Sequence, residues 1–178
     1  LPQEQQAEVI KKPHVANNSG NNEWYTPEWV IQAAREVMGG IDLDPASSDK
    51  ANEFVGAGTY YTEQDDGLAQ DWQGRLWMNP PYASGLVEKF TSKLVQEYRD
   101  GNVSAACVLV NNATETRWFQ DMLKVASAVC FIEGRVKFID INGNPSGAPL
   151  QGQAVLYLGP NVSVFTKEFS SYGVVCAI

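Results

Sequence analysis

Short apolar runs alternate with amphipathic stretches along the second half of the chain. Residues 104–110 and 128–132 are almost continuously apolar, while residues 84–98 and 118–123 carry apolar side chains at helical spacing. Continuous apolar runs are typical of strands buried on both faces of a parallel sheet. Strands that alternate with helices predict successive βαβ crossovers. The pattern therefore predicts an α/β fold with a mostly parallel sheet.

One amphipathic helix is predicted in the first quarter of the chain. Thr26 is a favourable N-cap, and Pro27 suits the first helical position. Apolar residues then recur at helical spacing as far as Met38, and the Gly39-Gly40 pair is a typical helix stop. The aromatic pair that precedes Thr26 either packs against the start of this helix or lines a ligand site beside it.

Two further strand-like pieces are predicted at residues 41–47 and 59–62, in a region that is otherwise mostly loop up to residue 72. The first piece ends in an acidic turn at Asp44. This carboxylate is placed either to bind a ribose or a cation, or to cap its own backbone in an Asx-turn. Asp65 and Asp66 precede a glycine, and they form either a paired-carboxylate site or an ordinary surface turn.

The most unusual stretch is residues 75–82, in which a short apolar strand runs into Asn79-Pro80-Pro81-Tyr82. Each proline fixes its own φ, lacks an N–H and disfavours the αR conformation in the preceding residue. A stiff, extended turn is therefore predicted at the carboxyl end of the strand, where open α/β sheets bind ligands. One amide side chain, bare carbonyls and an aromatic face in such a turn suit a planar group that carries an NH2.

The pattern changes after residue 132. Residues 135–139 alternate basic and apolar side chains, residues 142–153 are rich in Gly, Asn, Pro, Ser and Gln, and residues 154–158 are again apolar. This order predicts an antiparallel hairpin at about residues 133–158. The tip of the hairpin is either a substrate-recognition loop or an ordinary surface hairpin.

Composition narrows the functional classes. The chain has 178 residues and is 44% hydrophobic, which suits a single domain. We assign this domain to residues 23–178. Residues 1–22 are polar and are predicted to form a flexible tail. No apolar run approaches the roughly 20 residues of a membrane span. Three widely spaced cysteines favour a reducing cytoplasm, and no obligate protein partner is evident. The single histidine, His14, lies in the tail, which argues against a Ser-His-Asp enzyme and a histidine-rich metal site.

The net charge of −8 is unfavourable for binding a polyanion, but it is unevenly distributed. Residues 23–72 hold eleven acidic residues against two basic ones, whereas residues 73–178 hold nine basic residues against eight acidic ones. Because phosphate contacts dominate nucleic-acid affinity, such a ligand is expected to bind the C-terminal part. Arg135 and Lys137 are candidates there for phosphates or base edges, and Phe138 is a candidate for base stacking or core packing.

Three distinctive segments occur in a fixed order, namely Trp24-Tyr25-Thr26-Pro27, Leu43-Asp44-Pro45-Ala46-Ser47 and Asn79-Pro80-Pro81-Tyr82. Together they resemble the amino-methyltransferases that use S-adenosylmethionine, most closely the phage-type DNA adenine-N6 methyltransferases. The resemblance covers roughly residues 23–158. It implies a Rossmann-like methyltransferase fold and an enzyme that methylates adenine in double-stranded DNA, in the cytoplasm of a bacterium or a phage-infected cell. The Asp44 turn departs from many methyltransferases because it contains no glycine.

The resemblance also implies roles for individual residues. The cofactor-binding set is Tyr25, Thr26, Pro27, Asp44, Pro45, Ala46 and Asp66. The set that acts on the target base is Asn79, Pro80, Pro81 and Tyr82. In the first set, Tyr25 to Pro27 flank the methionine end of the cofactor, the Asp44 turn lines its pocket, and Asp66 reaches its adenine amine.

The implied chemistry requires no histidine and no metal. The side-chain oxygen of Asn79 and the carbonyl of Pro80 accept the two N–H groups of the adenine amine, so that the nitrogen can pyramidalise towards the methyl group. Tyr82 stacks on the base, and Pro81 stiffens the turn. Because a base inside a duplex cannot reach such a pocket, the adenine has to be flipped out.

Two alternatives remain open at the level of sequence. The same turn serves methyl transfer to another planar nitrogen, in RNA adenine, cytosine or a protein glutamine, and the acidic balance favours such targets somewhat. The glycine-free turn also leaves open a non-catalytic nucleic-acid-binding module with the same fold. Labelled methyl transfer separates the targets, and cofactor binding separates the enzyme from the module.

Overall fold

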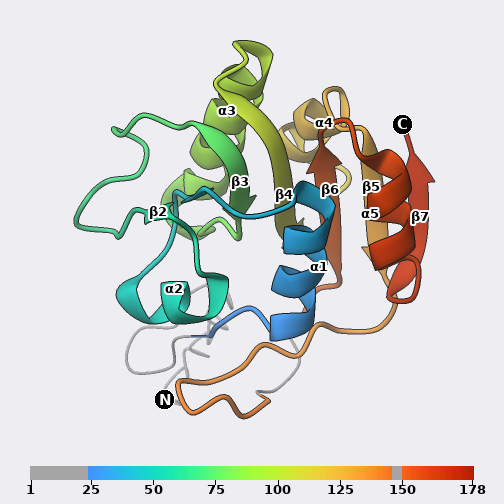
Figure 1. Ribbon diagram of the computed structural model, residues 1–178, viewed down its shortest axis with the longest axis horizontal. Helices are drawn as coiled ribbons and strands as arrows, with labels where there is room; N and C mark the ends of the chain where they lie inside the picture. The colour runs from blue at the N-terminus through green and yellow to red at the C-terminus, as the bar shows by residue number, and fades with distance from the viewer. Residues whose placement is uncertain (1–23, 146–149) are drawn as a thin grey trace, which may run out of the picture.

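A central sheet organises the protein, whose computed structural model describes residues 24–145 and 150–178. The strands are β1 (Leu43–Asp44), β2 (Thr59–Tyr60), β3 (Gly74–Met78), β4 (Val103–Asn111), β5 (Ala128–Ile132), β6 (Gln153–Leu158) and β7 (Gly173–Ala177). The helices are α1 (Glu28–Met38), α2 (Asp49–Val55), α3 (Leu86–Arg99), α4 (Arg117–Leu123) and α5 (Val162–Phe169), with a short 3-10 helix η1 (Ala83–Gly85). The strands form one sheet in the order β2-β1-β3-β4-β6-β5-β7 (Figure 1).

The direction of the strands decides where the loops gather. Strands β2, β1, β3 and β4 pair in parallel. Strand β6 is antiparallel to both β4 and β5, and β7 is antiparallel to β5. The carboxyl ends of β1, β3, β4 and β5 therefore lie along one edge of the sheet, called the carboxyl edge below. This mixed sheet confirms the predicted Rossmann-like α/β fold with antiparallel strands in its C-terminal part.

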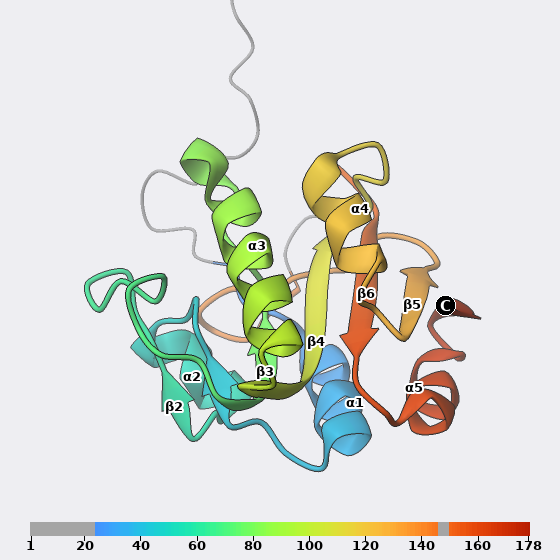
Figure 2. The ribbon, with the colours of Figure 1, turned by 90° about the horizontal axis from the view of Figure 1, so that it is seen from above.

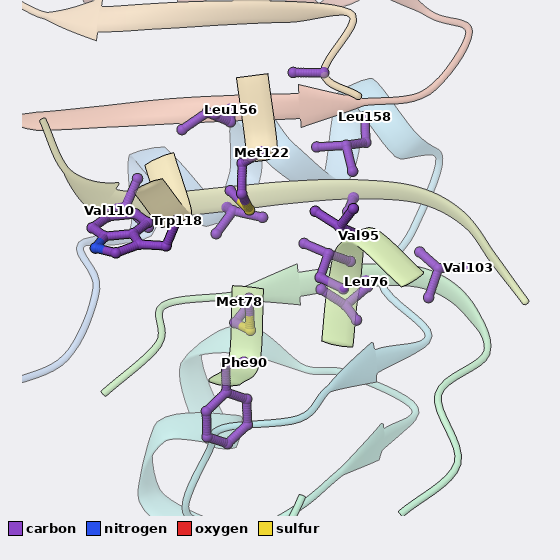
Figure 3. Close-up of a cluster of buried hydrophobic side chains, with 14 of the residues drawn as sticks. Leu76, Met78, Phe90, Val95, Val103, Val110, Trp118, Met122, Leu156 and Leu158 are labelled. Atoms are coloured by element: carbon purple, nitrogen blue, oxygen red, sulfur yellow. The ribbon is translucent and has the colours of Figure 1, made fainter. Parts of the chain in front are cut away.

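Helices cover both faces of the sheet. Figure 2 shows α3 and α4 on one face and α1 and α5 on the other. Along β3, Leu76 and Met78 belong to the buried cluster of α3 and α4, whereas Trp77 belongs to the cluster of α1 and α5. Figure 3 shows the first cluster, with Phe90 of α3 and Trp118 of α4 among its members. Burial on both faces explains why β3 and β4 are apolar along nearly their whole length.

Helix α1 follows the predicted pattern except at its first residue. It begins at Glu28 with Pro27 as the N-cap, and no side chain caps it. The prediction that Thr26 is the N-cap is therefore wrong, because the helix starts one residue later and the Thr26 hydroxyl has another partner, described below. At the other end, Gly39 adopts the left-handed conformation with φ 75°, as the predicted stop requires.

Helix α3 also begins later than the sequence predicts, and the start of α4 is set by a threonine cap. Residues 83–85 form η1, in which Ser84 has φ 52°, and α3 proper runs from Leu86. Helix α4 is capped by Thr116, whose hydroxyl accepts a hydrogen bond from the Phe119 N–H at 3.3 Å. Thr114, two residues earlier, is also a residue type that favours N-caps, and a cap there would be predicted from the sequence, but the chain makes one more turn before the helix begins.

The region predicted as loop between residues 47 and 72 contains helix α2. Ser48 is its N-cap, and the hydroxyl accepts a hydrogen bond from the Ala51 N–H at 3.0 Å. Val55 is the one buried residue among the seven residues of α2, so the helix has no apolar periodicity from which it could be predicted. Strand β1 and helix α2 thus form a βα unit that begins at the Asp44 turn.

The predicted hairpin is wrong in its pairing. Residues 135–139 form no strand with residues 154–158, because β6 lies between β4 and β5 and pairs with both. Figure 1 shows the segment after β5 running past the first turn of α1. There Ile139 forms an isolated antiparallel bridge with Tyr25. The strand at residues 153–158 therefore forms antiparallel pairs with β4 and β5 instead of with residues 135–139.

Two predictions fall outside the described residues, namely the tail at 1–22 and the part of the predicted tip at 146–149. In the part of the chain that the structure describes, no helix is long and apolar enough to cross a membrane.

Candidate active site

The fold brings two of the three distinctive segments to neighbouring strand ends. Asp44 is the last residue of β1, and Asn79 directly follows the last residue of β3. The two strands are parallel neighbours, with Leu43 opposite Leu76. Both side chains therefore lie at the carboxyl edge, where the sequence places a ligand site.

Asp44 is a buried carboxyl group. It is 3% exposed, and its Oδ1 accepts a hydrogen bond from the Ala46 N–H at 3.2 Å, which is the Asx-turn that local chemistry predicts. Burial raises the pKa of the Asp44 carboxyl to about 7, although hydrogen bonds from Ala46 and the Ser47 side chain lower it in part. Burial thus favours the protonated form of Asp44, and a bound hydrogen-bond donor would favour the ionised form.

A second loop packs closely on the Asp44 turn. A Cβ atom at Gly67 would lie 2.0 Å from the carbonyl oxygen of Pro45, so a glycine is required at this contact. Trp72 fixes the same loop through an indole hydrogen bond of 2.7 Å to the Gly67 carbonyl. The contact brings the exposed side chain of Asp66, at φ 53°, to the neighbourhood of β1.

Asp65 has a structural role in that loop. Its carboxylate accepts hydrogen bonds from both the N–H and the hydroxyl of Thr62, each at 2.8 Å. These bonds lower the pKa of Asp65. Asp65 and Asp66 therefore lie in a surface turn, which is the ordinary interpretation of Asp-Asp-Gly.

The remaining distinctive segment, Trp24-Tyr25-Thr26-Pro27, reaches the same edge through a long-range hydrogen bond between Thr26 and Asn79. The amide nitrogen of Asn79 donates a hydrogen bond of 3.3 Å to the hydroxyl of Thr26, which is 6% exposed. The backbone of Tyr25 exchanges two hydrogen bonds with Ile139, at 2.8 and 2.9 Å, and so holds this segment against the edge. Because the Asn79 nitrogen is engaged, its Oδ1 is the atom that remains to accept a hydrogen bond.

Tyr82 is fixed to the neighbouring strand. Its hydroxyl accepts a hydrogen bond of 2.7 Å from the N–H of Asn111, the last residue of β4. Its ring meets Trp118 edge-on, with the ring centroids 6.3 Å apart. Burial raises the pKa of Tyr82 above its usual range, so the hydroxyl stays protonated. The Asn79 turn is thus braced between β3, β4 and α4.

Tyr82 borders a polar cavity of about 540 Å³ at the carboxyl edge. The other walls come from the loop after β4, from Arg135 and from the residues just before β6. Arg135 donates a hydrogen bond of 2.7 Å to the Leu150 carbonyl across it. A second cavity of about 430 Å³ lies between the first turn of α1 and the α5–β7 connection, and Arg135 and Lys137 line it. Arg135 therefore borders both cavities.

Phe138 differs from the two cations beside it. Its side chain is partly buried and packs against the cluster of α1 and α5. This observation agrees with core packing, one of the two interpretations from the sequence, whereas stacking of Phe138 on a base stays a prediction.

One pair of polar residues at the edge has no counterpart in the sequence predictions. The Gln153 side-chain nitrogen donates a hydrogen bond of 2.6 Å to the side-chain oxygen of Asn111, 42 residues away. The available signal was that Asn111 ends an apolar strand, as Asn79 does. Its partner at the start of β6 could not be found from the sequence, because the contact depends on the antiparallel register of β4 and β6.

Comparison with known proteins identifies one family. A family model described as DNA N-6-adenine-methyltransferase (Dam) matches residues 14–172, which is most of the chain. The matched range contains all three distinctive segments and the whole carboxyl edge described above. A comparison with curated proteins returned no match.

Proposed function

The chain belongs to the DNA N-6-adenine-methyltransferase family, and from this premise we propose that it transfers a methyl group from S-adenosylmethionine to the 6-amino group of adenine in DNA. The observation that supports the proposal most directly is the orientation of Asn79. Its nitrogen donates a hydrogen bond to Thr26, which leaves its oxygen as an acceptor for a ligand. An acceptor beside a proline carbonyl at a parallel strand end suits an amine with two N–H groups.

The chemistry asked of the protein is positioning. The lone pair of the adenine amine is delocalised into the ring, which makes the nitrogen a poor nucleophile. Hydrogen bonds from the amine to Asn79 Oδ1 and the Pro80 carbonyl favour a pyramidal nitrogen and stabilise the positive charge that develops on it. A nitrogen–carbon bond forms as the carbon–sulfur bond breaks, and the extra proton leaves to solvent.

The residues at the end of β1 fit the cofactor. S-adenosylmethionine would supply the electrophilic methyl group, and its ammonium, ribose hydroxyls and adenine amine are all hydrogen-bond donors. The buried carboxyl of Asp44, in its turn with Pro45 and Ala46, offers an acceptor for such a donor. Asp66, held near this turn by the Gly67 contact, offers a second acceptor for the adenine amine.

Thr26 and its neighbours close the site on the other side. Because Thr26 is hydrogen-bonded to Asn79, we assign Tyr25 and Pro27 to the reacting end of the proposed cofactor pocket. We assign this segment to the methionine end of S-adenosylmethionine. The same segment joins the cofactor side to residues 135–139 through the bridge between Tyr25 and Ile139.

The DNA is proposed to lie along the carboxyl edge, with the target adenine flipped out of the duplex at a cost of a few kcal/mol. Tyr82 would stack on that base, and its fixed hydroxyl holds the ring in place. Arg135 and Lys137 would bind phosphates of the flanking backbone, and Phe138 would support them from the core. We place the reaction in the cytoplasm of a bacterial or phage-infected cell.

The test is transfer of a tritiated methyl group from S-adenosylmethionine to unmethylated DNA. We expect label in DNA as N6-methyladenine, and label only in RNA or protein would contradict the proposal. Replacing Asn79 by Ala should lower kcat by about 100-fold or more, as loss of a transition-state hydrogen bond does elsewhere. An unchanged melting temperature would show that the Asn79→Ala protein is folded, and full activity of that variant would overturn the role of Asn79.

A further inference from the structure

We propose that Asn111 reads the target base as a partner of Asn79, by donating a hydrogen bond from its amide nitrogen to the ring nitrogen beside the reacting amine, N1 of adenine. This inference rests on the proposed function. It adds a residue that determines which base is accepted. It also assigns Gln153 as the residue that positions Asn111.

The strand register places the two asparagines on one face of the sheet. Side chains alternate between faces along a strand. Trp77 of β3 and Leu109 of β4 both belong to the buried cluster of α1 and α5. Asn111, two residues further along β4, therefore lies on that same face, and Asn79, which directly follows β3, is hydrogen-bonded to Thr26 just before helix α1 of that face. Since β3 and β4 are parallel neighbours, both amides stand at the carboxyl edge.

Two fixed hydrogen bonds give the amides opposite polarity. Asn79 uses its nitrogen on Thr26, which leaves its oxygen as an acceptor. Asn111 uses its oxygen on Gln153, at 2.6 Å, which leaves its nitrogen as a donor. Gln153 is 4% exposed, so its side chain is largely shielded from water. Within the described residues, the Asn111 side-chain nitrogen has no hydrogen-bond partner, and Asn111 lines the cavity that Tyr82 borders.

An acceptor beside a donor matches the Watson–Crick edge of adenine, which carries an amine donor next to the N1 acceptor. Thymine and guanine carry the reverse pattern, a carbonyl oxygen next to an N–H, so each would meet an unmatched group at both positions. Buried polar groups left unpaired in this way reject the wrong ligand strongly. Cytosine has the same pattern as adenine, so the pair of amides selects amino bases against keto bases.

The first experiment compares two variants with the same change of charge. Asn111→Asp keeps an oxygen for Gln153 but replaces the donor with a carboxylate oxygen that faces the base. Asn112→Asp places the same charge on the next residue, whose exposed side chain lines the same cavity. We expect kcat/KM for DNA to fall at least about tenfold more for Asn111→Asp than for Asn112→Asp, the loss typical of one hydrogen bond to a charged or polar partner. Equal losses would overturn the proposal.

The second experiment changes the base and leaves the protein intact. Oligonucleotides carry the sequence that the wild-type protein methylates, with the target as adenine, 1-deazaadenine or 7-deazaadenine. We expect about a tenfold loss of kcat/KM with 1-deazaadenine, which lacks the N1 acceptor, and little loss with 7-deazaadenine, which keeps it. Asn111→Leu should be slow with adenine but should show little further loss with 1-deazaadenine.

Equal rates for the wild-type protein on the two deaza bases would overturn the role of Asn111 and leave the proposed function standing. A wild-type protein that methylates no DNA would overturn the proposed function and, with it, this inference.

Discussion

Asn79 owes its orientation to a single hydroxyl group. Thr26 is buried, and its Oγ1 is the partner of the Asn79 nitrogen at 3.3 Å. Without that hydroxyl the amide can rotate and present its nitrogen to the amine, which is repulsive. We therefore propose that Thr26 acts through Asn79, in addition to its proposed place beside the cofactor.

Replacing Thr26 by Val should lower kcat about tenfold at saturating cofactor and DNA, because the shape is kept and one hydrogen bond is lost. Thr26→Ser, which restores the hydroxyl, should recover most of the rate. Steady-state methyl transfer and a thermal melt check both variants. A serine variant as slow as the valine variant would show that the methyl group, and not the hydroxyl, matters.

The pKa of Asp44 predicts how stability depends on pH. Burial raises this pKa from 3.8 to about 7 in the folded protein, so between pH 4 and 7 the folded state holds a proton that the unfolded state has lost. The free energy of unfolding should therefore fall as pH rises through this window, by up to about 4 kcal/mol. Asp44→Asn, neutral at every pH, should remove this fall while weakening cofactor binding.

Thermal melts at pH 5 and pH 8 measure the difference, and calorimetry measures the cofactor affinity. The same pH dependence in Asp44→Asn and wild-type protein would show that this carboxyl does not titrate between them. Equal cofactor affinity of Asp44→Asn and wild-type protein would show that Asp44 does not bind the cofactor.

At the scale of elements, the site depends on loops that are packed against strand ends. The loop carrying Asp66 contacts the β1 turn at Gly67, the Asn79 turn is tied to β4 through Tyr82, and the segment after β5 is tied to Tyr25. Each of these three contacts involves backbone atoms of at least one partner. Of these contacts, the one at Gly67 leaves no room for a larger side chain.

Gly67→Ala should destabilise the protein by about 1–3 kcal/mol, because a Cβ atom would lie 2.0 Å from the Pro45 carbonyl oxygen and one loop has to shift. Cofactor affinity should fall with it, since the shift moves the Asp44 turn. Gly58→Ala is the matched control, because its Cβ would meet its nearest atom at an ordinary 3.5 Å. Denaturant unfolding and calorimetry of both variants measure the two effects, and equal effects would contradict the close packing.

At the scale of the whole molecule, charge is segregated. The net charge is −8, and the excess of acid lies in residues 23–72, whereas the later residues are close to neutral. Arg135 lines the cavity that Tyr82 borders, and both Arg135 and Lys137 line the second cavity, beside the first turn of α1. Phosphates are therefore expected to approach along the carboxyl edge and to avoid the acidic half.

Lys137→Gln should weaken DNA binding and reduce the slope of log affinity against log salt by about 1, the change expected for one phosphate contact. Lys124→Gln is the control, because Lys124 is exposed but lies at the end of α4 away from the carboxyl edge, where it pairs with Asp121. Binding titrations across a range of salt concentrations give both slopes. An unchanged slope for Lys137→Gln would exclude it from the interface.

Local patterns were sufficient for the fold class and for the turn that follows β3 at Asn79. Apolar runs predicted the central strands, and two prolines after Met78 predicted the turn at Asn79, because both depend on sterics and burial within a few residues. Local patterns did not predict helix α2, because only one of its residues is buried. They also did not predict which strands pair with β6, because that pairing depends on contacts across the sheet.

The sequence by itself determined which chemical groups stand at the ends of the strands: a carboxyl at Asp44, an amide at Asn79 and a second amide at Asn111. Only the tertiary structure decided which atom of each amide is hydrogen-bonded within the protein. That choice depends on Thr26, 53 residues from Asn79, and on Gln153, 42 residues from Asn111. An amide is a donor at one end and an acceptor at the other, so its role is set by whichever end the fold has already used.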